Sequence, residues 1–418
     1  MSGARTAGPP VANPLYALLD PAVRPDPHPV LAGIREAGPL RVDDGLVIVG
    51  DYRGCLQVMR DSAMGSDTLG SPRLRGVLPA GGTQQVLESI FFMDPPDHGR
   101  QRRLISKAFT PRITSRYEPW IGRILDGLFA EFEGRDTFDG VADFANRLSL
   151  GTICELMEIP PGDAAMLKEW SDELALATEV PTLVAAFGSS EMFSTEELAG
   201  FGSTSVAIHA YFADLIHKRR RSPGEDLISS LIHTEDEGRT LARHEVTNVL
   251  LNLFAAAHES VTNLITNGIL ALSRNPAQAA LLRRDPSIAP LLVEEVLRYD
   301  APVQLTARVA LAPTRVGDLD IEPGTVVILL LAAGNRDEAE FPGADRFLAD
   351  RRTKGIGLAF GAGPHFCIGA SLARLEAAMA FRSLTERFDD FSVDEESLAY
   401  RPHVVVRGLR TMTVRFRR

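Results

Sequence analysis

The chain has 418 residues, of which 45% are hydrophobic, and its formal net charge is −11. This much apolar matter supplies a large core and excludes a disordered or fibrous chain. The acidic balance argues against a protein that wraps nucleic acid or binds anionic lipid. The length allows one large domain or two to three smaller ones. Of the 44 basic residues only four are Lys, a skew that fits a GC-rich bacterial genome.

The three cysteines, Cys55, Cys154 and Cys367, show no CxxC spacing. A disulfide framework is therefore not expected, and a reducing cytosol is the default. The first 30 residues are rich in Pro and lack the apolar run of a signal peptide. The longest purely apolar run, 326–333, is too short to span a bilayer. We expect a cytoplasmic protein without a membrane anchor.

The predicted elements begin with a hairpin at 40–49, whose turn is Asp44-Gly45. From about 98 to 300 the periodicity is mostly helical, most clearly at 121–132, 206–221 and 285–299. Strand patterns return at 303–332, 403–406 and 411–416, and one more helix is predicted at 371–388. Because βαβ units do not alternate, the pattern indicates a mainly α fold with a smaller β-rich portion (α+β) rather than a doubly wound nucleotide-binding fold.

A basic segment opens the helical region. In the run DPPDHGRQRR at 94–103, Asp97 and the prolines indicate the start of a helix. His98 and Arg102 then share one helical face, where they repel each other unless an anion lies between them. For this pair alone, a solvated basic face is an equally good interpretation. The wider patch suits an acidic protein partner and comprises Arg100, Arg102, Arg103, Lys107, Arg112 and Arg116.

One long helix is predicted over 241–274, with Thr240 as its N-cap and Asn275-Pro276 as its stop. A helix of about 34 residues spans ~50 Å, which is enough to cross a domain. Its middle must then be buried, yet it reads AAHES at 256–260. Buried polar groups are costly without partners, so these residues are either paired or functional.

Several partial matches to the sequence motifs of other protein classes are too incomplete to indicate a function. His258-Glu259 and His244-Glu245 both lack the second His of a zinc-protease helix. The run GAG at 361–363 lacks the third glycine of a dinucleotide-binding motif, because Phe366 stands there. Glu295 and Arg298 can pair three residues apart, which by itself is a common surface salt bridge.

The most informative segment is FGAGPHFCIG at 360–369. It joins a strand-like run at 355–360 to the helix that begins near Ser371, so Cys367 stands at a helix N-terminus. Backbone N–H groups and the helix dipole stabilise a thiolate there. The glycines let the backbone pass close to something flat or bulky. A buried structural cysteine is the alternative, although three glycines, Pro364 and His365 weigh against it.

Taken together, these segments resemble the cytochrome P450 family, the heme-thiolate monooxygenases, in its soluble bacterial form. The likeness rests on the FGxGxHxCxG loop at 360–369, the ExxR helix at 295–298, the HxxxR helix opening at 98–102 and the acid–alcohol pair at 259–260, which occur in family order. It covers nearly the whole chain. It implies a cytochrome P450 fold with 1–418 as a single domain, helix-rich at about 90–300 and 371–388 and β-rich at about 40–50, 303–332 and 403–416.

The resemblance also implies heme b as the cofactor, with Cys367 as the axial thiolate and the metal ligand. Phe360 would pack on the thiolate side of the heme. The two heme propionates need fixed donors, and Arg offers a bidentate fork for a carboxylate. The implied propionate-binding residues are His98, Arg102, Arg308 and His365. Behind the loop, a structural triad is expected of Glu295, Arg298 and Arg346.

By the same resemblance, the long helix crosses the distal face of the heme with Asn252, Ala256 and Ser260 on one stripe. Ser260 would donate a hydrogen bond to dioxygen, and Glu259 would relay protons from solvent. The family pattern reads Ala-Gly-x-acid-Thr, so the chain departs from it at Ala257 and Ser260. Ser keeps the hydroxyl but lacks the methyl that stiffens χ1. We therefore expect looser proton delivery, or an outcome other than plain hydroxylation.

The implied reaction inserts one oxygen atom of O2 into a small, largely apolar substrate, in bacterial specialised metabolism. Electrons would come from NAD(P)H through a ferredoxin reductase and an acidic ferredoxin docking near the 100–116 patch of a monomer. The substrate would touch parts of 64–92 and 178–205, together with Asn252, Ala256, Val303, Leu305 and Val405. For Asn252, a buried amide satisfied by the backbone is at least as good an interpretation.

Three other functions stay open. The same heme chemistry could end in oxidative coupling, desaturation or peroxide-driven oxidation. A hydrolase could use Ser371 or Cys367 as its nucleophile, and a heme-binding sensor would not turn over. A Soret band separates the heme proteins from the hydrolase, and turnover with a redox partner separates the enzyme from the sensor.

Overall fold

A computed structural model describes residues 12–74, 77, 89–174, 176–353 and 355–417. Helices dominate these residues and the strands form small sheets, which confirms the expected α+β class. The α-helices are α1 (His28–Glu36), α2 (Tyr52–Arg60), α4 (Asp97–Ser106), α5 (Pro111–Thr114), α6 (Glu118–Glu131), α7 (Asn146–Leu156), α8 (Ala164–Leu174), α9 (Leu176–Phe187), α10 (Thr195–Arg221), α11 (Leu227–His233), α12 (Arg243–Arg274), α13 (Pro276–Arg284), α14 (Ala289–Tyr299), α15 (Leu331–Gly334) and α16 (Ala370–Arg387).

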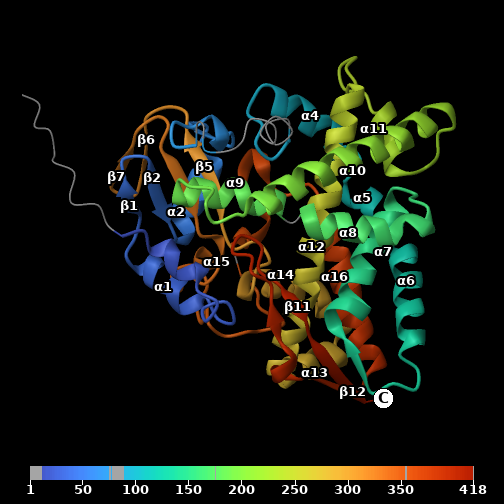
Figure 1. Ribbon diagram of the computed structural model, residues 1–418. Coiled ribbons are helices and arrows are strands. Elements are labelled where there is room, and N and C mark those ends of the chain that lie inside the picture. Colours follow the sequence, from blue (N-terminus) through green and yellow to red (C-terminus); the bar gives the residue numbers. More distant parts are fainter. Residues whose placement is uncertain (1–11, 75–76, 78–88, 175, 354, 418) are drawn as a thin grey trace, which may run out of the picture.

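The strands are β1 (Leu40–Asp43), β2 (Leu46–Val49), β3 (Met64–Gly65), β4 (Thr137–Asp139), β5 (Thr306–Ala310), β6 (Thr314–Val316), β7 (Leu319–Ile321), β8 (Val326–Leu329), β9 (Asp390–Val393), β10 (Ala399–Tyr400), β11 (Leu409–Thr411) and β12 (Thr413–Arg417). The largest sheet has the order β1-β2-β8-β5-β3, and a smaller one has the order β4-β12-β9. Figure 1 shows the larger sheet with α1 and α2 on one side of the molecule and the helical body on the other.

The predicted hairpin forms as β1 and β2, which pair antiparallel with Leu40 opposite Ile48. The carboxylate of Asp43 accepts the N–H of Gly45 at 2.8 Å and closes the turn. Every residue of β2 is buried, because β2 also pairs in parallel with β8. The hairpin thus brings the N-terminal part of the chain into one sheet with the segment around 303–332.

The long helix forms as α12, although Thr240 is not its cap. The helix begins at Arg243 after Ala242, and Glu245 accepts the N–H of Ala242 at 2.8 Å. The side chain of Glu245, in the first turn, thus caps the N-terminus of the helix by accepting a free backbone N–H, the role expected of Thr240. From Val261 to Leu272 every residue of α12 is buried, as in a helix that crosses a core.

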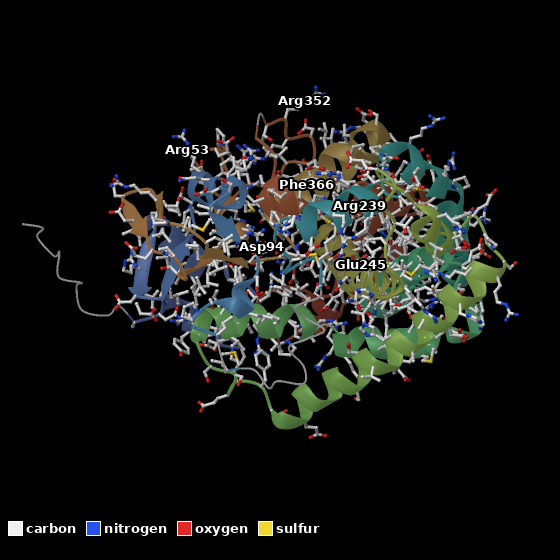
Figure 2. The ribbon with its side chains drawn as sticks, turned by 90° about the horizontal axis from the view of Figure 1, so that it is seen from above. Arg53, Asp94, Arg239, Glu245, Arg352 and Phe366 are labelled. Atoms are coloured by element: carbon white, nitrogen blue, oxygen red, sulfur yellow. The ribbon has the colours of Figure 1, made fainter. Side chains whose placement is uncertain are left out.

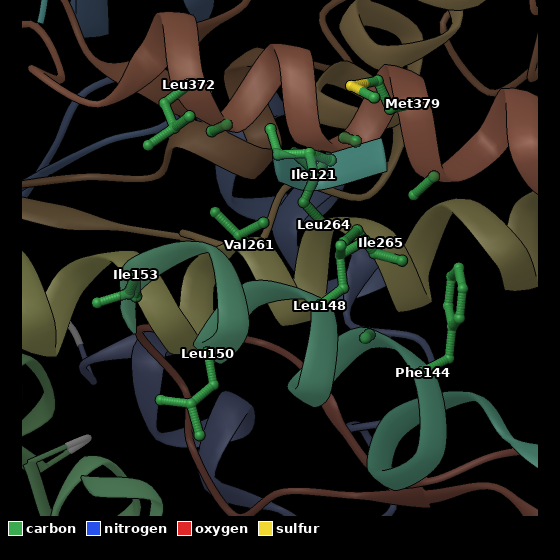
Figure 3. Packing of buried hydrophobic residues seen from close by; sticks show 14 of the residues in the cluster. Ile121, Phe144, Leu148, Leu150, Ile153, Val261, Leu264, Ile265, Leu372 and Met379 are labelled. Carbon is green, nitrogen blue, oxygen red and sulfur yellow. The ribbon is translucent and has the colours of Figure 1, made fainter. Parts of the chain in front are cut away.

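The main core lies where α12 packs against α7 and α16 (Figure 3). Val261, Leu264 and Ile265 face residues such as Leu148 and Leu372 across these contacts. A Cβ on Gly268 would lie 2.1 Å from the ring of Phe381, so glycine is what lets α12 and α16 approach so closely. The two helices that carry the candidate site are therefore held rigidly against each other.

Two predicted strands are wrong. The run at 403–406 makes only an isolated bridge between Val303 and Val406, because its N–H groups are bound by the side chain of Glu179. The run at 355–360 ends in a 3-10 turn, Leu358–Phe360, because the N–H of Leu358 donates to the side chain of Asn335 at 2.6 Å. Among the described residues, no helix is long and apolar enough to cross a membrane.

Candidate active site

Cys367 lies on a short loop between a 3-10 turn, Gly363–His365, and the start of α16. Its N–H donates to the carbonyl of Phe360 at 2.8 Å, which closes the loop on itself. Gly363 has φ of 70°, and a Cβ there would lie 2.3 Å from the carbonyl oxygen of Met59 on α2. The predicted glycine requirement therefore arises from close packing of the loop on α2.

Burial raises the pKa of the Cys367 thiol. The N–H groups of Gly369 and Ala370 and the guanidinium groups of Arg102 and Arg374 act in the opposite direction, as expected for a helix N-terminus, but burial outweighs them. The thiol by itself is therefore not an activated nucleophile. A cation bound at the sulfur would supply the missing stabilisation, because a coordinating thiol loses its proton outright.

Arg374 was missed from the sequence. It lies in the first turns of α16, and its guanidinium lies 4.5 Å from the centre of the Phe360 ring. It also donates to Glu294 at 3.2 Å. Its place near the start of the predicted helix that follows the Cys367 loop was the signal that could have identified it.

Four basic side chains meet beside this loop. His98 and Arg102 come from α4, Arg308 from β5, and His365 from the loop itself. The rings of His98 and His365 stack with their centres 3.9 Å apart. The sequence thus predicted correctly which basic residues come together.

Buried positive charge on these four basic side chains would be stabilised by a bound anion. Burial lowers the pKa of Arg308 to about 10, and burial together with the neighbouring cations lowers the pKa of His365 to about 3. Among the described residues, neither Arg102 nor Arg308 forms an ion pair, and the buried Nε2 of His98 has no hydrogen-bond partner. A cofactor that carries carboxylates fits this site, since it would supply charged acceptors to guanidinium groups whose hydrogen bonds among the described residues go to carbonyls.

Asp94 is the acidic residue next to this cluster, and it too was missed. Its carboxylate accepts the N–H of Ser66 at 2.7 Å and of Asp67 at 3.3 Å, so it ties the segment before α4 to the end of β3. It raises the pKa of His98 and Arg308, against the effect of burial. Figure 2 shows Asp94 and Phe366 near the middle of the molecule, between the sheet and the helical body.

On α12, the expected distal residues carry hydrogen bonds of their own. The hydroxyl of Ser260 donates to the carbonyl of Ala256 at 2.6 Å, one turn earlier. The side chain of Asn252 accepts from Ser89 at 3.0 Å, so a side chain rather than the backbone satisfies it. Ser260 can therefore accept a further hydrogen bond in this rotamer, whereas donation to dioxygen requires its hydroxyl to turn.

Glu259 is buried and points away from bulk solvent, toward the C-terminal segment. One carboxylate oxygen, Oε1, lies 3.7 Å from Arg401 and 3.5 Å from Nδ1 of His403. Neither basic residue was identified from the sequence as a partner of the acid. Both stand in the run 401–406, whose apolar part suggested only a strand.

Three of the expected substrate-contacting residues come from two adjacent segments. The N–H of Gln304 donates to the carbonyl of Val405 at 2.8 Å, so Val303 and Leu305 lie beside Val405. Leu305 and Val405 are almost completely buried. Of the wider expected lining, residues 75–76 and 78–88 lie outside the described part of the chain.

The structural triad contains one residue that differs from the prediction. Glu295 is fully buried and pairs with Arg298 at 2.8 Å and with Arg351, not Arg346, at 2.9 Å. Arg346 has an exposed side chain and contributes its carbonyl oxygen, which accepts from both of these guanidinium groups. The turn after Phe347 places Arg351 opposite Glu295, whose carboxylate also accepts the N–H of Leu348 at 2.8 Å.

The predicted basic patch is largely neutralised within the chain. Arg100 pairs with Glu245, while Arg103 and Lys107 share Asp236. Arg102 turns inward and donates to the carbonyl of Phe366. Only two members are exposed and form no ion pair among the described residues, Arg112 and Arg116.

Comparison with known proteins gives a consistent family assignment. The family model for cytochrome P450 matches residues 71–285 and 288–406. Cytochrome P450 107B1 of Saccharopolyspora erythraea is 38% identical over 325 residues, covering 77% of this chain and 76% of that protein. Cytochrome P450 monooxygenase PikC of Streptomyces venezuelae is 34% identical over 426 residues, covering 99% and 96%. The crystal structure of CYP164A2 of Mycobacterium smegmatis superposes with a TM-score of 0.86 at 35% identity, covering 96% and 99%.

Proposed function

Because the chain belongs to the cytochrome P450 family of heme-binding oxidoreductases, we propose that it inserts one oxygen atom of O2 into a small, largely apolar organic molecule. When bound, heme b supplies the oxygen activation, which a cysteine thiolate on its iron favours. The observation that carries the proposal is Cys367 at the N-terminus of α16, beside four basic groups that lack an anion.

Cys367 would bind the iron, and the ring of Phe360, which the guanidinium of Arg374 contacts, would pack beside it. His98, Arg102, Arg308 and His365 hold the two propionates. The support for this assignment is the unsatisfied Nε2 of His98 and the unpaired guanidinium groups among the described residues. Charge-assisted hydrogen bonds of this kind are about twice as strong as neutral ones, so they orient as well as retain the cofactor.

Ala256 and Ser260 of α12 would line the cofactor site, and the substrate would lie against Asn252, Val303, Leu305 and Val405. The three aliphatic side chains among these would exclude water and select an apolar molecule. Ser260 positions a proton at its hydroxyl, and Glu259 holds the proton that follows. The burial of Glu259 among basic partners supports a role in moving protons rather than in binding solvent.

Electrons come from NAD(P)H through a ferredoxin reductase and an acidic ferredoxin. The docking site we propose is centred on Arg112 and Arg116, because they are the exposed members of the patch that form no ion pair with any residue the structure describes. They lie on and just after α5, which packs against α16, the helix that follows Cys367. This gives the electron donor a short approach to the thiolate side of the cofactor.

One observation favours a second outcome of the same heme chemistry. The donation from Ser260 to Ala256 closes the helical turn at which the family pattern has a glycine at 257. A closed turn narrows the space in which a proton-carrying water can stand. Of the alternative outcomes, a peroxide-driven reaction demands less from this relay, because hydrogen peroxide already carries the two protons that O2 must take up, whereas oxidative coupling and desaturation driven by O2 need the same two protons as plain hydroxylation.

The test uses the purified protein and the Cys367→Ala variant. The native protein should show a Soret band, and its reduced carbon monoxide adduct should show the red-shifted band of a thiolate ligand, which the variant lacks. Ligands that shift the heme spin state then identify the substrate class. A hydrolase would show no Soret band. Consumption of NADH with ferredoxin and reductase, together with an oxygenated product, distinguishes the enzyme from a sensor and from a peroxide-driven oxidase.

A further inference from the structure

A buried cluster of acids and bases lies between α12 and the C-terminal segment 401–407. Its centre is His403, whose Nδ1 lies 3.5 Å from Oε1 of Glu259. Among the described residues, neither of these two atoms has a hydrogen-bond partner. Two buried polar atoms that face each other at this distance form a direct bond after a small rotation of either side chain.

A second carboxylate fixes the other side of the cluster. Glu179 of α9 is 1% exposed, and its carboxylate accepts the N–H groups of Val404, Val405 and Val406 at 2.8 to 3.1 Å. These three residues follow His403 directly, so Glu179 holds the backbone that positions the imidazole. The cluster thus links a residue of the substrate-contacting segment, Val405, to the acid on α12.

The charges around His403 favour its protonated form. Burial lowers the pKa of its imidazole and Arg401 lowers it further, but the carboxylates of Glu259 and Glu179 outweigh both and raise it. The groups that face it are therefore Glu259 from α12, Glu179 from α9 and Arg401 from its own segment. The two carboxylates therefore favour the form of the ring that can give a proton to a neighbouring carboxylate.

A cavity of about 30 Å³ borders His403. It is lined by His403, Arg401, Gln304, Tyr400 and Arg24, among others. The buried Nε of Arg24 and Oε1 of Gln304 have no hydrogen-bond partner among the described residues. A site needs roughly 10–15 Å³ and two or more polar partners to hold a water molecule, so this cavity is large and polar enough for one. The side chains of Arg401 and His403 are 15% and 14% exposed, so the cavity reaches solvent.

We propose that His403 is the group through which protons pass from this cavity to Glu259. In the step, the imidazolium gives its Nδ1 proton to Oε1 of Glu259 and becomes neutral. The neutral ring then rotates and takes up at Nδ1 a solvent proton that the cavity water relays, so that the water itself is unchanged, and Glu259 passes its proton on toward Ser260. Insertion of one oxygen atom and reduction of the other to water consumes protons, so the step supplies a reactant of the proposed reaction. The inference rests on the proposed function, and His403 acts through Glu259 as a positioning and proton-transferring residue.

The first test compares the native holoenzyme with His403→Gln, which keeps the size and polarity of the side chain but cannot titrate. Oxidation of NADH with a ferredoxin and its reductase is followed across neutral pH in H2O and in D2O. We expect His403→Gln to slow the oxidation ~10-fold or more, to flatten the pH profile and to enlarge the solvent isotope effect. His233→Gln, which changes a histidine on α11, should behave as the native protein does.

A second measurement does not depend on turnover or on the folding of the His403 variant. In protein with 15N-labelled histidine, bound with carbon monoxide in the reduced state, NMR follows the titration of each ring. Glu259→Gln should lower the pKa of the ring nearest to it, because it removes the carboxylate that stabilises the charged imidazole. The proposal is overturned if no histidine pKa moves in Glu259→Gln, or if His403→Gln keeps the native pH profile and isotope effect. A native protein that consumes no O2 would instead contradict the proposed function and leave the NMR coupling intact.

Discussion

Nε of Arg351 lies 2.9 Å from Oε2 of Glu295, and the guanidinium of Arg298 contacts the same oxygen at 2.8 Å. The Glu295 side chain has no solvent exposure, so its charge depends entirely on these two cations and on the N–H of Leu348. The arrangement joins α14 to the segment that precedes the Cys367 loop. Loss of one cation from a buried carboxylate is costly, because the remaining charge stays buried.

We therefore predict that Arg351→Met destabilises the protein by about 3 kcal/mol, since it leaves Glu295 with one cation. Arg346→Met is the matched control. Arg346 is exposed and offers only its backbone carbonyl, so its substitution should change the free energy of unfolding by less than about 0.5 kcal/mol. Denaturant unfolding of both holoproteins measures the difference. Equal destabilisation by the two variants would contradict this assignment of the triad.

The sequence predicted the pair of Glu295 and Arg298 but not the third residue, Arg351. Glu295 and Arg298 are related by helical spacing, which a sequence displays directly. Arg346 and Arg351 both lie in an irregular segment, where no period tells which side chain turns inward. The same holds for Glu179, because nothing in the sequence links α9 to the backbone at 404–406.

The candidate site was predictable for a related reason. His98 and Arg102 share a helix face, and Cys367 stands in a loop whose glycines are required by the close approach of α2. Residues that act through long-range contacts, such as Asp94 and His403, carry no such local pattern. The two strands that were predicted wrongly, 355–360 and 403–406, have apolar alternation, but side chains bind their backbone N–H groups in place of a neighbouring strand.

Arg308 should help the protein retain heme, but it should destabilise the fold of the heme-free chain. Arg308→Gln removes a charge-assisted hydrogen bond to the cofactor, worth about 1.5–3 kcal/mol, so heme should be lost ~10- to 100-fold faster. Transfer of heme to excess apomyoglobin measures this rate. In the heme-free chain the same change should raise the midpoint of unfolding, because burial alone lowers the pKa of this unpaired cation to about 10. Arg315→Gln, at an exposed position, serves as the control and should change neither quantity.

The three hydrogen bonds that Glu179 accepts should govern the mobility of the segment 404–406. In Glu179→Gln an amide replaces one acceptor oxygen with a donor, which faces the N–H groups of 404–406. We expect the amides of Val405 and Val406 to exchange with solvent at least ~10-fold faster, since each lost bond to a charged acceptor is worth about 1.5–3 kcal/mol. Hydrogen exchange followed by mass spectrometry provides the test. Unchanged protection of this segment would show that Glu179 does not hold it.

A histidine far from the heme should make stability depend on pH. His28, at the start of α1, is buried beside Arg336 and Asp300, and burial with the neighbouring arginines lowers its pKa from 6.5 to about 4. In the unfolded chain the imidazole of His28 becomes protonated below pH 6.5, whereas in the folded chain it stays neutral until about pH 4. Stability from this group is therefore complete above pH 6.5 and is lost as the pH falls toward 4, by about 3 kcal/mol in total. The unfolding free energy of His28→Gln should depend less on pH across this window than that of the native protein.

The last prediction concerns Ser260, whose hydroxyl bonds to the carbonyl of Ala256 at 2.6 Å. If this hydroxyl positions a proton, Ser260→Ala should keep the rate of reductant consumption within a few-fold while most of the electrons end in peroxide. Ser260→Thr should raise the product formed per NADH above the native value, because the added methyl holds χ1 in a narrow range. Both ratios are measured with a substrate found in the spin-state screen. Equal product per NADH in all three proteins would remove Ser260 from the mechanism. Proton delivery would then depend on Glu259 and the groups behind it alone.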